Sequence, residues 1–177
     1  DKLVKQLLEL MKLEYGKREL QNANFNITEL IQEVIRKSKV MLEENNIDVK
    51  IEMPDEVMVY ADEFYIEQVV TNYVTNAIKH AKEIFNEKYI KVTIEKRKRK
   101  DKVRISVFNT GDNIEEENLQ RIWRRFYKVD SSRNRANGGT GIGLSLVKAI
   151  MNNYNNDFGV RNKDTGVEFY FDLDIGK

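Results

Sequence analysis

The chain has 177 residues, the size of one domain with a hydrophobic core of its own. It carries 30 Lys and Arg residues against 29 Asp and Glu residues, so no field of one sign indicates a nucleic-acid or membrane surface. The absence of cysteine excludes disulfides and thiolate metal sites, and no apolar run reaches the ~20 residues of a membrane-spanning helix.

The N-terminal part shows two helical patterns. Residues 1–21 place apolar side chains at helical spacing, on a face that is wide for so short a segment. Because the pattern is already helical at Asp1, we expect a piece of a longer protein and the end of a helix whose partner helices lie outside this chain. A helix packed on its own domain is the alternative. After a break at 24–27, Thr28 is expected to cap a helix that runs to about residue 44.

Strand and helix patterns follow one another in the rest of the chain. Asp62 is placed to cap a long helix that ends near Ala81, and a second helix is expected over 142–154. Strands are expected where apolar residues alternate: 47–51, 57–60, 90–94, 103–107, 158–160 and 167–173. We therefore predict an α+β sandwich, in which a mixed, mostly antiparallel sheet carries helices on one face.

Polar residues line one side of the long helix. Asn72, Asn76 and His80 are four residues apart, and Lys79 lies beside them. We call Asn72 and Asn76 the asparagine stripe. Carboxamide oxygens are hard, neutral ligands that suit Mg²⁺, and a neighbouring lysine can meet phosphate charge. The alternative is a polar helix face in contact with solvent.

A glycine-rich loop precedes the second helix. Four glycines occupy the six positions 138–143, and glycine lets backbone N–H groups at a helix N-terminus approach an anion. The spacing is not G-x-G-x-x-G, and no G-x-x-x-x-G-K-S/T occurs, which argues against a dinucleotide fold and excludes a P-loop. A flexible linker is the alternative.

An Asn-Thr-Gly turn and a long polar segment lie between these motifs. Asn109 ends a strand at the edge of the sheet, where its side-chain oxygen can accept a hydrogen bond. Residues 122–128 are aromatic and basic, and residues 131–137 are polar. Because so long a loop in a compact domain is usually functional or disordered, we expect a lid that closes on a phosphate ligand.

Taken in this order, the motifs resemble the catalytic ATP-binding domain of two-component sensor histidine kinases, in the superfamily shared with gyrase, the Hsp90 chaperones and MutL. The segments similar to its N box, first glycine box, F box and second glycine box are 72–81, 109–114, 123–130 and 139–144. The resemblance covers 22–177 and implies a sandwich of the Bergerat type. It makes 1–21 similar to the end of the dimerisation and phosphoacceptor helix.

The resemblance implies ATP and Mg²⁺ as ligands. Asn76 would coordinate the metal, with support from Asn72. Lys79, His80 and Lys128 would meet the phosphates, so these three and Asn76 are the expected catalytic residues.

Other residues would hold the base and the lid. Asn109 would bond the adenine amine, and Phe126 would anchor the lid in an apolar pocket. The remaining nucleotide contacts implied by the resemblance are Gly111, Ile114, Tyr127, Gly139, Thr140, Gly141, Gly143 and Leu144.

Four positions depart from the family pattern. Asn109 stands where Asp is common, so we expect weaker adenine binding, because bonds to charged groups are about twice as strong as neutral ones. Asn113 replaces a glycine, which puts backbone freedom there in question. Trp123 replaces Phe, and Val167 stands where a hydroxyl residue often supplies a water-mediated adenine contact.

Asn72 separates subfamilies. Relatives that hydrolyse ATP, and the anti-sigma serine kinases, carry Glu in its place as a base, and Asn cannot take a proton at neutral pH. The implied function is therefore transfer of the γ-phosphoryl group to a histidine on an adjoining domain, which serves a response regulator indirectly. The single histidine, His80, lies in the nucleotide helix, so this chain is not expected to autophosphorylate alone. We expect the cytoplasmic part of a membrane-anchored kinase, without membrane contact of its own.

Two other functions stay open. An ATP-driven clamp of the gyrase or chaperone kind is disfavoured by Asn72 and the short chain. A degenerate nucleotide-binding module is kept open by Asn109, Asn113 and Val167. The basic run 96–100 does not indicate nucleic-acid binding, because it lies in a hairpin turn without interleaved aromatic residues.

Overall fold

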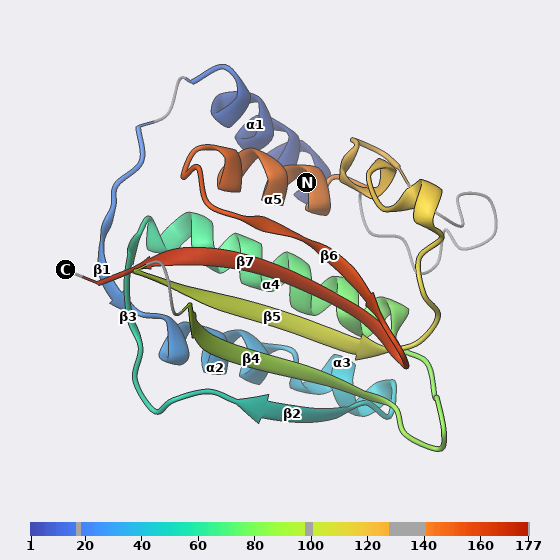
Figure 1. Ribbon diagram of the computed structural model, residues 1–177. Coiled ribbons are helices and arrows are strands. Elements are labelled where there is room, and N and C mark those ends of the chain that lie inside the picture. The colour runs from blue at the N-terminus through green and yellow to red at the C-terminus, as the bar shows by residue number, and fades with distance from the viewer. Residues whose placement is uncertain (17–18, 98–100, 128–140, 177) are drawn as a thin grey trace.

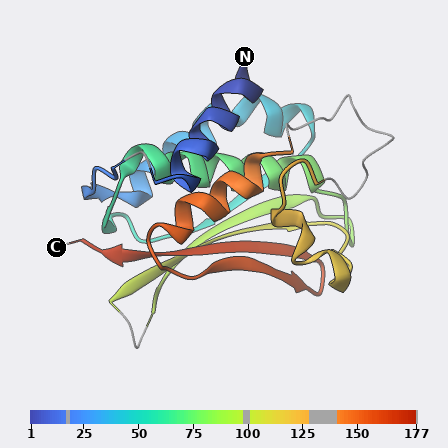
Figure 2. The same ribbon diagram turned by 90° about the horizontal axis from the view of Figure 1, so that it is seen from above.

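The computed structural model describes residues 1–16, 19–97, 101–127 and 141–176, and it consists of one sheet with helices on one face (Figure 1). Seen from above, the helices all lie on the same side of the sheet and leave the other face open (Figure 2). The helical elements are α1 Lys2–Glu14, α2 Ile27–Lys37, α3 Lys39–Glu44, α4 Glu63–His80 and α5 Gly143–Asn152, with short 3-10 turns η1 Glu116–Asn118 and η2 Arg121–Trp123. The strands are β1 Ala23–Asn26, β2 Asp48–Glu52, β3 Met58–Ala61, β4 Tyr89–Arg97, β5 Lys102–Thr110, β6 Phe158–Lys163 and β7 Gly166–Ile175.

The strands form a mixed sheet in the order β1-β3-β7-β5-β4-β2, and β6 also pairs with β7. The pair β2 and β4 is parallel, whereas the other pairs are antiparallel. The predicted α+β sandwich with helices on one face is therefore confirmed. Within the described ranges, no helix has both the length and the apolar character needed to cross a membrane.

Helix α4 lies over the middle of the sheet and positions the asparagine stripe. Asp62 accepts a hydrogen bond from the backbone N–H of Phe64 at 3.1 Å, and so caps the helix as predicted. The Tyr73 ring packs against Phe169 and Phe171 of β7, with ring centroids 5.4 and 5.8 Å apart. The buried side of α4 follows helical spacing: Tyr65, Ile66, Val69, Val70, Tyr73, Val74, Ala77 and Ile78. Burial of this apolar side turns the stripe to the flank of the helix.

Tyr154, just after α5, joins the end of that helix to the start of α4. Its hydroxyl accepts a hydrogen bond from Asp62 N at 2.8 Å and donates one to Asn22 Oδ1 at 2.9 Å. Burial raises the pKa of Tyr154 from 10.0 to about 12, and burial also raises the pKa of Tyr73. Folding therefore favours the neutral phenols. Their contribution to stability is complete below pH 10 and is lost as the pH rises above it.

We expect the free energy of unfolding to fall between pH 10 and about 12, and to fall less steeply in Tyr154→Phe than in the wild type. Denaturant unfolding at several pH values in this window measures both slopes. Tyr15→Phe is the matched control, because Tyr15 is 70% exposed. Parallel slopes for Tyr154→Phe and wild type would contradict the role given to this hydroxyl.

Helix α1 is shorter than predicted and packs on its own domain. It ends at Glu14 rather than near residue 21. Leu10 and Leu13 belong to the hydrophobic core, and the helix contacts α5. Four other apolar residues stay exposed: Leu3, Val4, Leu8 and Met11. That 1–21 is also the end of a phosphoacceptor helix stays a prediction.

The helix predicted from Thr28 to about residue 44 starts at Ile27 and divides into α2 and α3. Asn26 Oδ1 accepts hydrogen bonds from the backbone N–H groups of Thr28 and Glu29 at 3.1 and 3.4 Å, so Asn26, not Thr28, is the cap. Asn26 also ends β1, where a break was predicted. The Ser38 hydroxyl donates to Val34 O at 2.9 Å, and α2 ends there before α3 begins.

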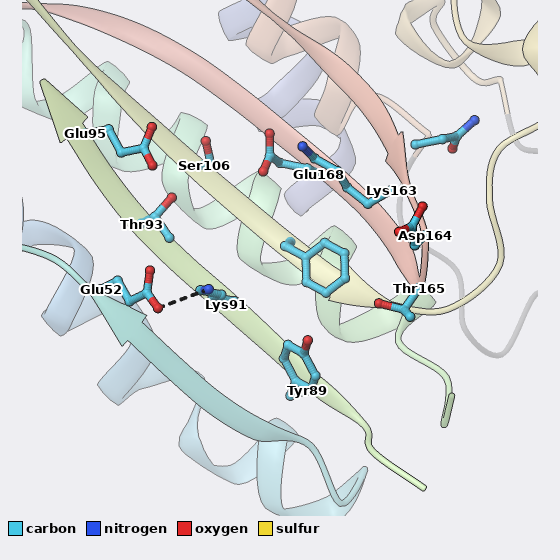
Figure 3. Close-up of a pocket in the computed structure, with 12 residues that line it drawn as sticks. Glu52, Tyr89, Lys91, Thr93, Glu95, Ser106, Lys163, Asp164, Thr165 and Glu168 are labelled. Carbon is cyan, nitrogen blue, oxygen red and sulfur yellow. Dashed lines mark ion pairs between the residues drawn. The ribbon is translucent and has the colours of Figure 1, made fainter. Parts of the chain in front are cut away.

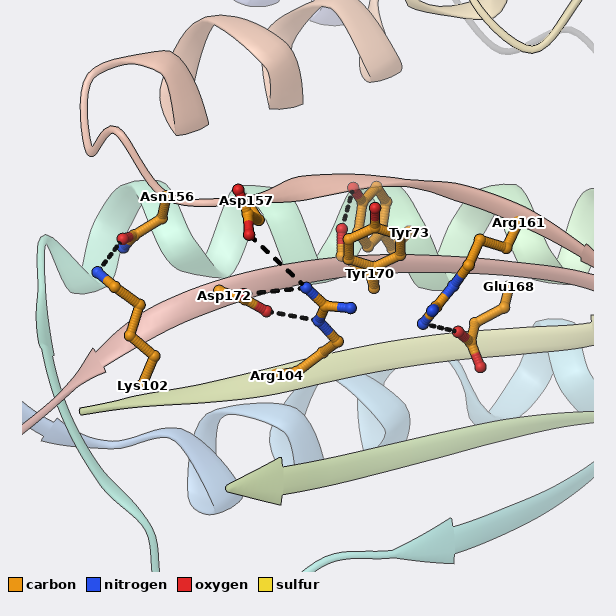
Figure 4. A network of polar contacts seen from close by, with 9 residues as sticks. All are labelled: Tyr73, Lys102, Arg104, Asn156, Asp157, Arg161, Glu168, Tyr170 and Asp172. Atoms are coloured by element: carbon orange, nitrogen blue, oxygen red, sulfur yellow. Dashed lines mark hydrogen bonds and ion pairs between the residues drawn. The ribbon is translucent and has the colours of Figure 1, made fainter. Parts of the chain in front are cut away.

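The open face of the sheet carries paired charges around one aromatic ring (Figure 4). Arg104 donates to Asp172 twice, from Nε at 2.7 Å and from Nη2 at 3.1 Å, and this hydrogen bonding raises the pKa of Arg104. Asp172 is fully buried and Arg104 is 8% exposed. The guanidinium groups of Arg104 and Arg161 lie 4.2 and 4.7 Å from the Tyr170 ring centroid, and Arg161 also pairs with Glu168 at 2.7 Å.

Candidate functional site

The asparagine stripe and the glycine-rich loop meet in the structure. Gly143 is the first residue of α5, and a Cβ built on it would lie 2.7 Å from Asn72 Oδ1. The Asn72 amide donates from Nδ2 to Gln68 O at 2.8 Å, and this bond holds its oxygen towards Gly143. A side chain at Gly143 would therefore require the Asn72 side chain to move away. Two motifs some seventy residues apart in the sequence therefore share one site.

The rest of the stripe continues along the flank of α4. Asn76 lies one turn beyond Asn72, and both are half-buried, so their side chains keep access to a ligand. Lys79 and His80 are exposed at the C-terminal end of the helix, where His80 is the last helical residue. The half-buried carboxamide of Asn76 has the donor chemistry that Mg²⁺ accepts from proteins. These four residues thus line one flank in the order that the sequence predicts.

The first glycine box joins the end of β5 to the end of α4. The backbone N–H of Lys82 donates to Thr110 O at 2.8 Å. Gly111 has φ 151°, and a Cβ there would lie 2.8 Å from His80 O. Asn109 is 2% exposed, and its Nδ2 donates to Thr110 O at 3.0 Å, which leaves the side-chain oxygen as the group that can accept. The expected base-binding residue is therefore held beside the helix that carries the stripe.

Strand β7 closes this end of the site with small and apolar residues. Val167 pairs with Asn109 across the sheet and is 4% exposed. A Cβ at Gly166 would lie 1.9 Å from Asn109 O, so the two strands are in direct backbone contact. The structure thus gives an apolar wall where a hydroxyl residue is common in the family.

The base of the expected lid is anchored by Trp123 and not by Phe126. Trp123 is 7% exposed, and its ring lies 5.2 Å from the Phe158 ring and 5.9 Å from the Phe169 ring. Phe126 is 58% exposed, which corrects the expectation that it fills an apolar pocket. The reason is local, because Phe126 has φ 59° and donates its N–H to Gly141 O at 2.7 Å, and this turn points its ring outward.

Further expected contacts lie near this base. The Tyr127 ring is half-buried against the core, and its hydroxyl donates to Asn118 Oδ1 at 2.5 Å. Ile114 and Leu144 are also half-buried against the core. The Phe126 to Gly141 bond joins the aromatic and basic segment to the residues just before α5. Three expected contacts lie outside the described residues: Lys128, Gly139 and Thr140.

A shallow hollow of about 500 Å³ lies elsewhere, on the open face of the sheet (Figure 3). Its side chains stand on β2, β4, β5, β6 and β7 and on the β6–β7 turn, on the face away from α4. Several of its side chains already contact one another, since Lys91 pairs with Glu52 at 3.0 Å and the Tyr89 and Phe108 ring centroids lie 5.7 Å apart. None of the predicted site residues lines it. The candidate site is therefore on the helix side, between α4, α5 and the end of β5.

The chain is similar to known proteins over most of its length. Residues 61–177 match the family described as histidine kinase-, DNA gyrase B-, and HSP90-like ATPase. The sensor-like histidine kinase SenX3 of Mycobacterium tuberculosis is 29% identical over 168 residues, which cover 94% of this chain and 40% of SenX3. The chain thus spans about two fifths of the length of this relative.

Solved structures show the same fold. The nucleotide-free catalytic domain of the histidine kinase ThkA matches with a TM-score of 0.75 and 33% identity, over 90% of this chain and 97% of that domain. Full-length ShkA in complex with AMPPNP matches in fold with a TM-score of 0.84 and 24% identity, over 99% of this chain and 36% of ShkA. The chain therefore belongs to the histidine kinase-, DNA gyrase B-, and HSP90-like ATPase family, as a histidine kinase catalytic domain.

Proposed function

We propose that this chain binds Mg²⁺ and ATP and transfers the γ-phosphoryl group to a histidine on an adjoining phosphoacceptor domain of the same protein. The observation that carries the proposal is the contact between Asn72 on α4 and Gly143 at the start of α5, with Asn109 and Gly111 at the end of the same helix. This arrangement supports a nucleotide laid along α4, with its base at Asn109 and its phosphates at the N-terminus of α5.

Different residues at this site would bind different parts of the Mg²⁺ and ATP complex. The backbone N–H groups at the start of α5, with Gly141 and Gly143 free of side chains, suit the phosphate oxygens. Asn76 would hold Mg²⁺, which when bound neutralises phosphate charge. Lys79 and His80 add donors at the exposed end of the helix. Lys128, Gly139 and Thr140, and the lid to which they would belong, remain part of the proposal.

The chemistry proposed is transfer and not hydrolysis. Asn72 is held by its bond to Gln68 O and has no proton-accepting carboxylate to activate water. The attacking group would come from the adjoining domain, so positioning and charge stabilisation are the contributions of this chain. The crystal structure of ThkA in complex with the response regulator TrrA supports a response regulator as the indirect partner here. The sensor kinase relatives support a place in the cytoplasmic part of a membrane-anchored kinase.

Calorimetric titration with ATP, with and without Mg²⁺, tests the proposal. We expect the wild type to bind ATP more tightly when Mg²⁺ is present. In Asn76→Ala the increase in ATP affinity caused by Mg²⁺ should largely disappear. We expect the affinity for the Mg²⁺ complex of ATP to fall about tenfold or more. Asn152→Ala, at an exposed position at the far end of α5, is the matched control and should bind as the wild type does.

The other outcomes favour the other functions. No ATP binding by the folded wild type would favour a degenerate module. Steady ATP hydrolysis by this chain alone would favour a clamp. Acid-labile label from radioactive ATP on this chain alone would contradict the view that its phosphoacceptor lies on another domain.

A further inference from the structure

Two asparagines fasten the loop of the first glycine box to the turn between β6 and β7. Asn113 Nδ2 donates to Lys163 O and to Gly166 O, both at 2.9 Å. The backbone N–H of Ile114 donates to Asn162 Oδ1 at 2.9 Å, and Asn162 Nδ2 donates back to Ile114 O at 2.8 Å. Both hydrogens of the Asn113 amide and both ends of the Asn162 amide are used.

A backbone bond completes this contact. The N–H of Gly111 donates to Thr165 O at 3.0 Å, so five hydrogen bonds join the loop to the turn. Asn113 does not have positive φ, so the backbone at this position does not need the glycine that is usual in the family. The side chain that replaces glycine here therefore adds bonds without straining the chain.

The turn between β6 and β7 benefits from such support. Asp164 and Thr165 form a two-residue turn, and Lys163 pairs with Gly166 across it. Two-residue hairpin turns that match the strand twist need positive φ, which neither Asp164 nor Thr165 has. The Asn113 amide bonds to the carbonyls on both sides of the turn and ties them to one donor group.

The same turn sets the place of the expected base-binding residue. Gly166 begins β7 and lies against the backbone of Asn109, so closely that a Cβ on Gly166 would be 1.9 Å from Asn109 O. Any shift of Gly166 is therefore transmitted to Asn109. Asn109 is neutral, so its single acceptor must be held in position for good hydrogen-bond geometry with an adenine amine.

We propose that Asn113, together with Asn162, is a positioning residue for the adenine end of the nucleotide site. It acts through the β6–β7 turn and Gly166 on Asn109, and it does not itself touch the nucleotide. This inference rests on the function proposed above, in which Asn109 bonds the base. It predicts a change in recognition of the base and none in recognition of the phosphates.

Comparing affinity for ATP with affinity for inorganic tripolyphosphate, both with Mg²⁺, tests the inference. We expect Asn113→Ala to bind ATP about tenfold more weakly and tripolyphosphate as well as the wild type does. Asn162→Ala, which removes the neighbouring pair of bonds, should likewise weaken ATP binding and leave tripolyphosphate binding unchanged. Asn152→Ala is the control and should leave both unchanged. Thermal unfolding of each variant shows that the compared proteins are folded.

The outcomes separate the inference from the function beneath it. Equal weakening of both ligands in Asn113→Ala would overturn the inference, because general loosening of the domain would act on both. Unchanged ATP affinity in the folded Asn113→Ala and Asn162→Ala variants would overturn it as well. A folded wild type that does not prefer ATP to tripolyphosphate would refute base recognition itself, and the inference with it.

Discussion

Replacing Asp172 by alanine should destabilise the domain by about 3–5 kcal/mol, which is a large part of the total stability expected of a domain, roughly 5–15 kcal/mol. The reason is the partner that remains. Arg104 is 8% exposed and donates to both carboxylate oxygens of Asp172. The variant therefore leaves a buried guanidinium whose remaining carboxylate partner, Asp157, is 4.0 Å away and exposed. Urea unfolding at neutral pH measures the loss.

A neighbouring ion pair provides the matched control. Glu168→Ala removes the partner of Arg161, which lies over the same Tyr170 ring, but the Arg161 side chain is 47% exposed. Water can replace the lost contact there, so we expect a cost of about 0–1 kcal/mol. The double variant Arg104→Met with Asp172→Leu should recover much of the loss, since no buried charge remains. Equal losses of unfolding free energy in Asp172→Ala and Glu168→Ala would show that burial does not determine the cost of breaking these ion pairs.

Replacing Gly166 by alanine should prevent the normal pairing of β5 and β7. The added methyl group would meet Asn109 O at 1.9 Å and Asn109 C at 2.8 Å. These are backbone atoms, which cannot turn aside as a side chain does. We expect a loss on the order of 3 kcal/mol or more in unfolding free energy, with loss of ATP binding in any protein that remains folded.

Gly159 on β6 is a suitable control for this substitution. A Cβ there would first meet the Tyr170 hydroxyl at 2.7 Å, which is the end of a side chain. Gly159→Ala should therefore be clearly milder than Gly166→Ala in thermal unfolding. A Gly166→Ala variant as stable as Gly159→Ala would mean that the strands separate without much cost, and would contradict the tight contact at Asn109.

Helix α4 and the long strands could be predicted because their patterns are regular. Asp62 precedes an uninterrupted helical stripe, and the alternation in β4, β5 and β7 is regular because the alternate apolar residues of each strand face the hydrophobic core. That the asparagine stripe and the glycine-rich loop belong to one nucleotide site was expected from the resemblance. The direct contact between Asn72 and Gly143 was not. Its physical cause, an amide oxygen in the space that a Cβ at Gly143 would fill, could be seen only in three dimensions.

Short elements and long-range contacts could not be predicted from the pattern. Strand β1 has four residues and a single buried one, Phe25, which is too little for an alternation to appear. The division between α2 and α3 at Ser38 depends on one hydroxyl bonded to Val34 O. That Phe126 is exposed, while Trp123 is buried, depends on the backbone hydrogen bond from Phe126 N–H to Gly141 O. Each of these is decided by a contact and not by periodicity.

The packing of helix α1 limits how far this chain can be truncated at its N-terminal end. Leu10 and Leu13 are part of the same hydrophobic core as the sheet, and Glu9 accepts a hydrogen bond from the Tyr65 hydroxyl at 3.1 Å. At the other end of the helix, Glu14 pairs with Arg125 at the base of the expected lid. A shortened version that starts at β1 would lose Leu10 and Leu13 from the hydrophobic core and the hydrogen bond between Tyr65 and Glu9. A shortened version for expression should therefore keep α1.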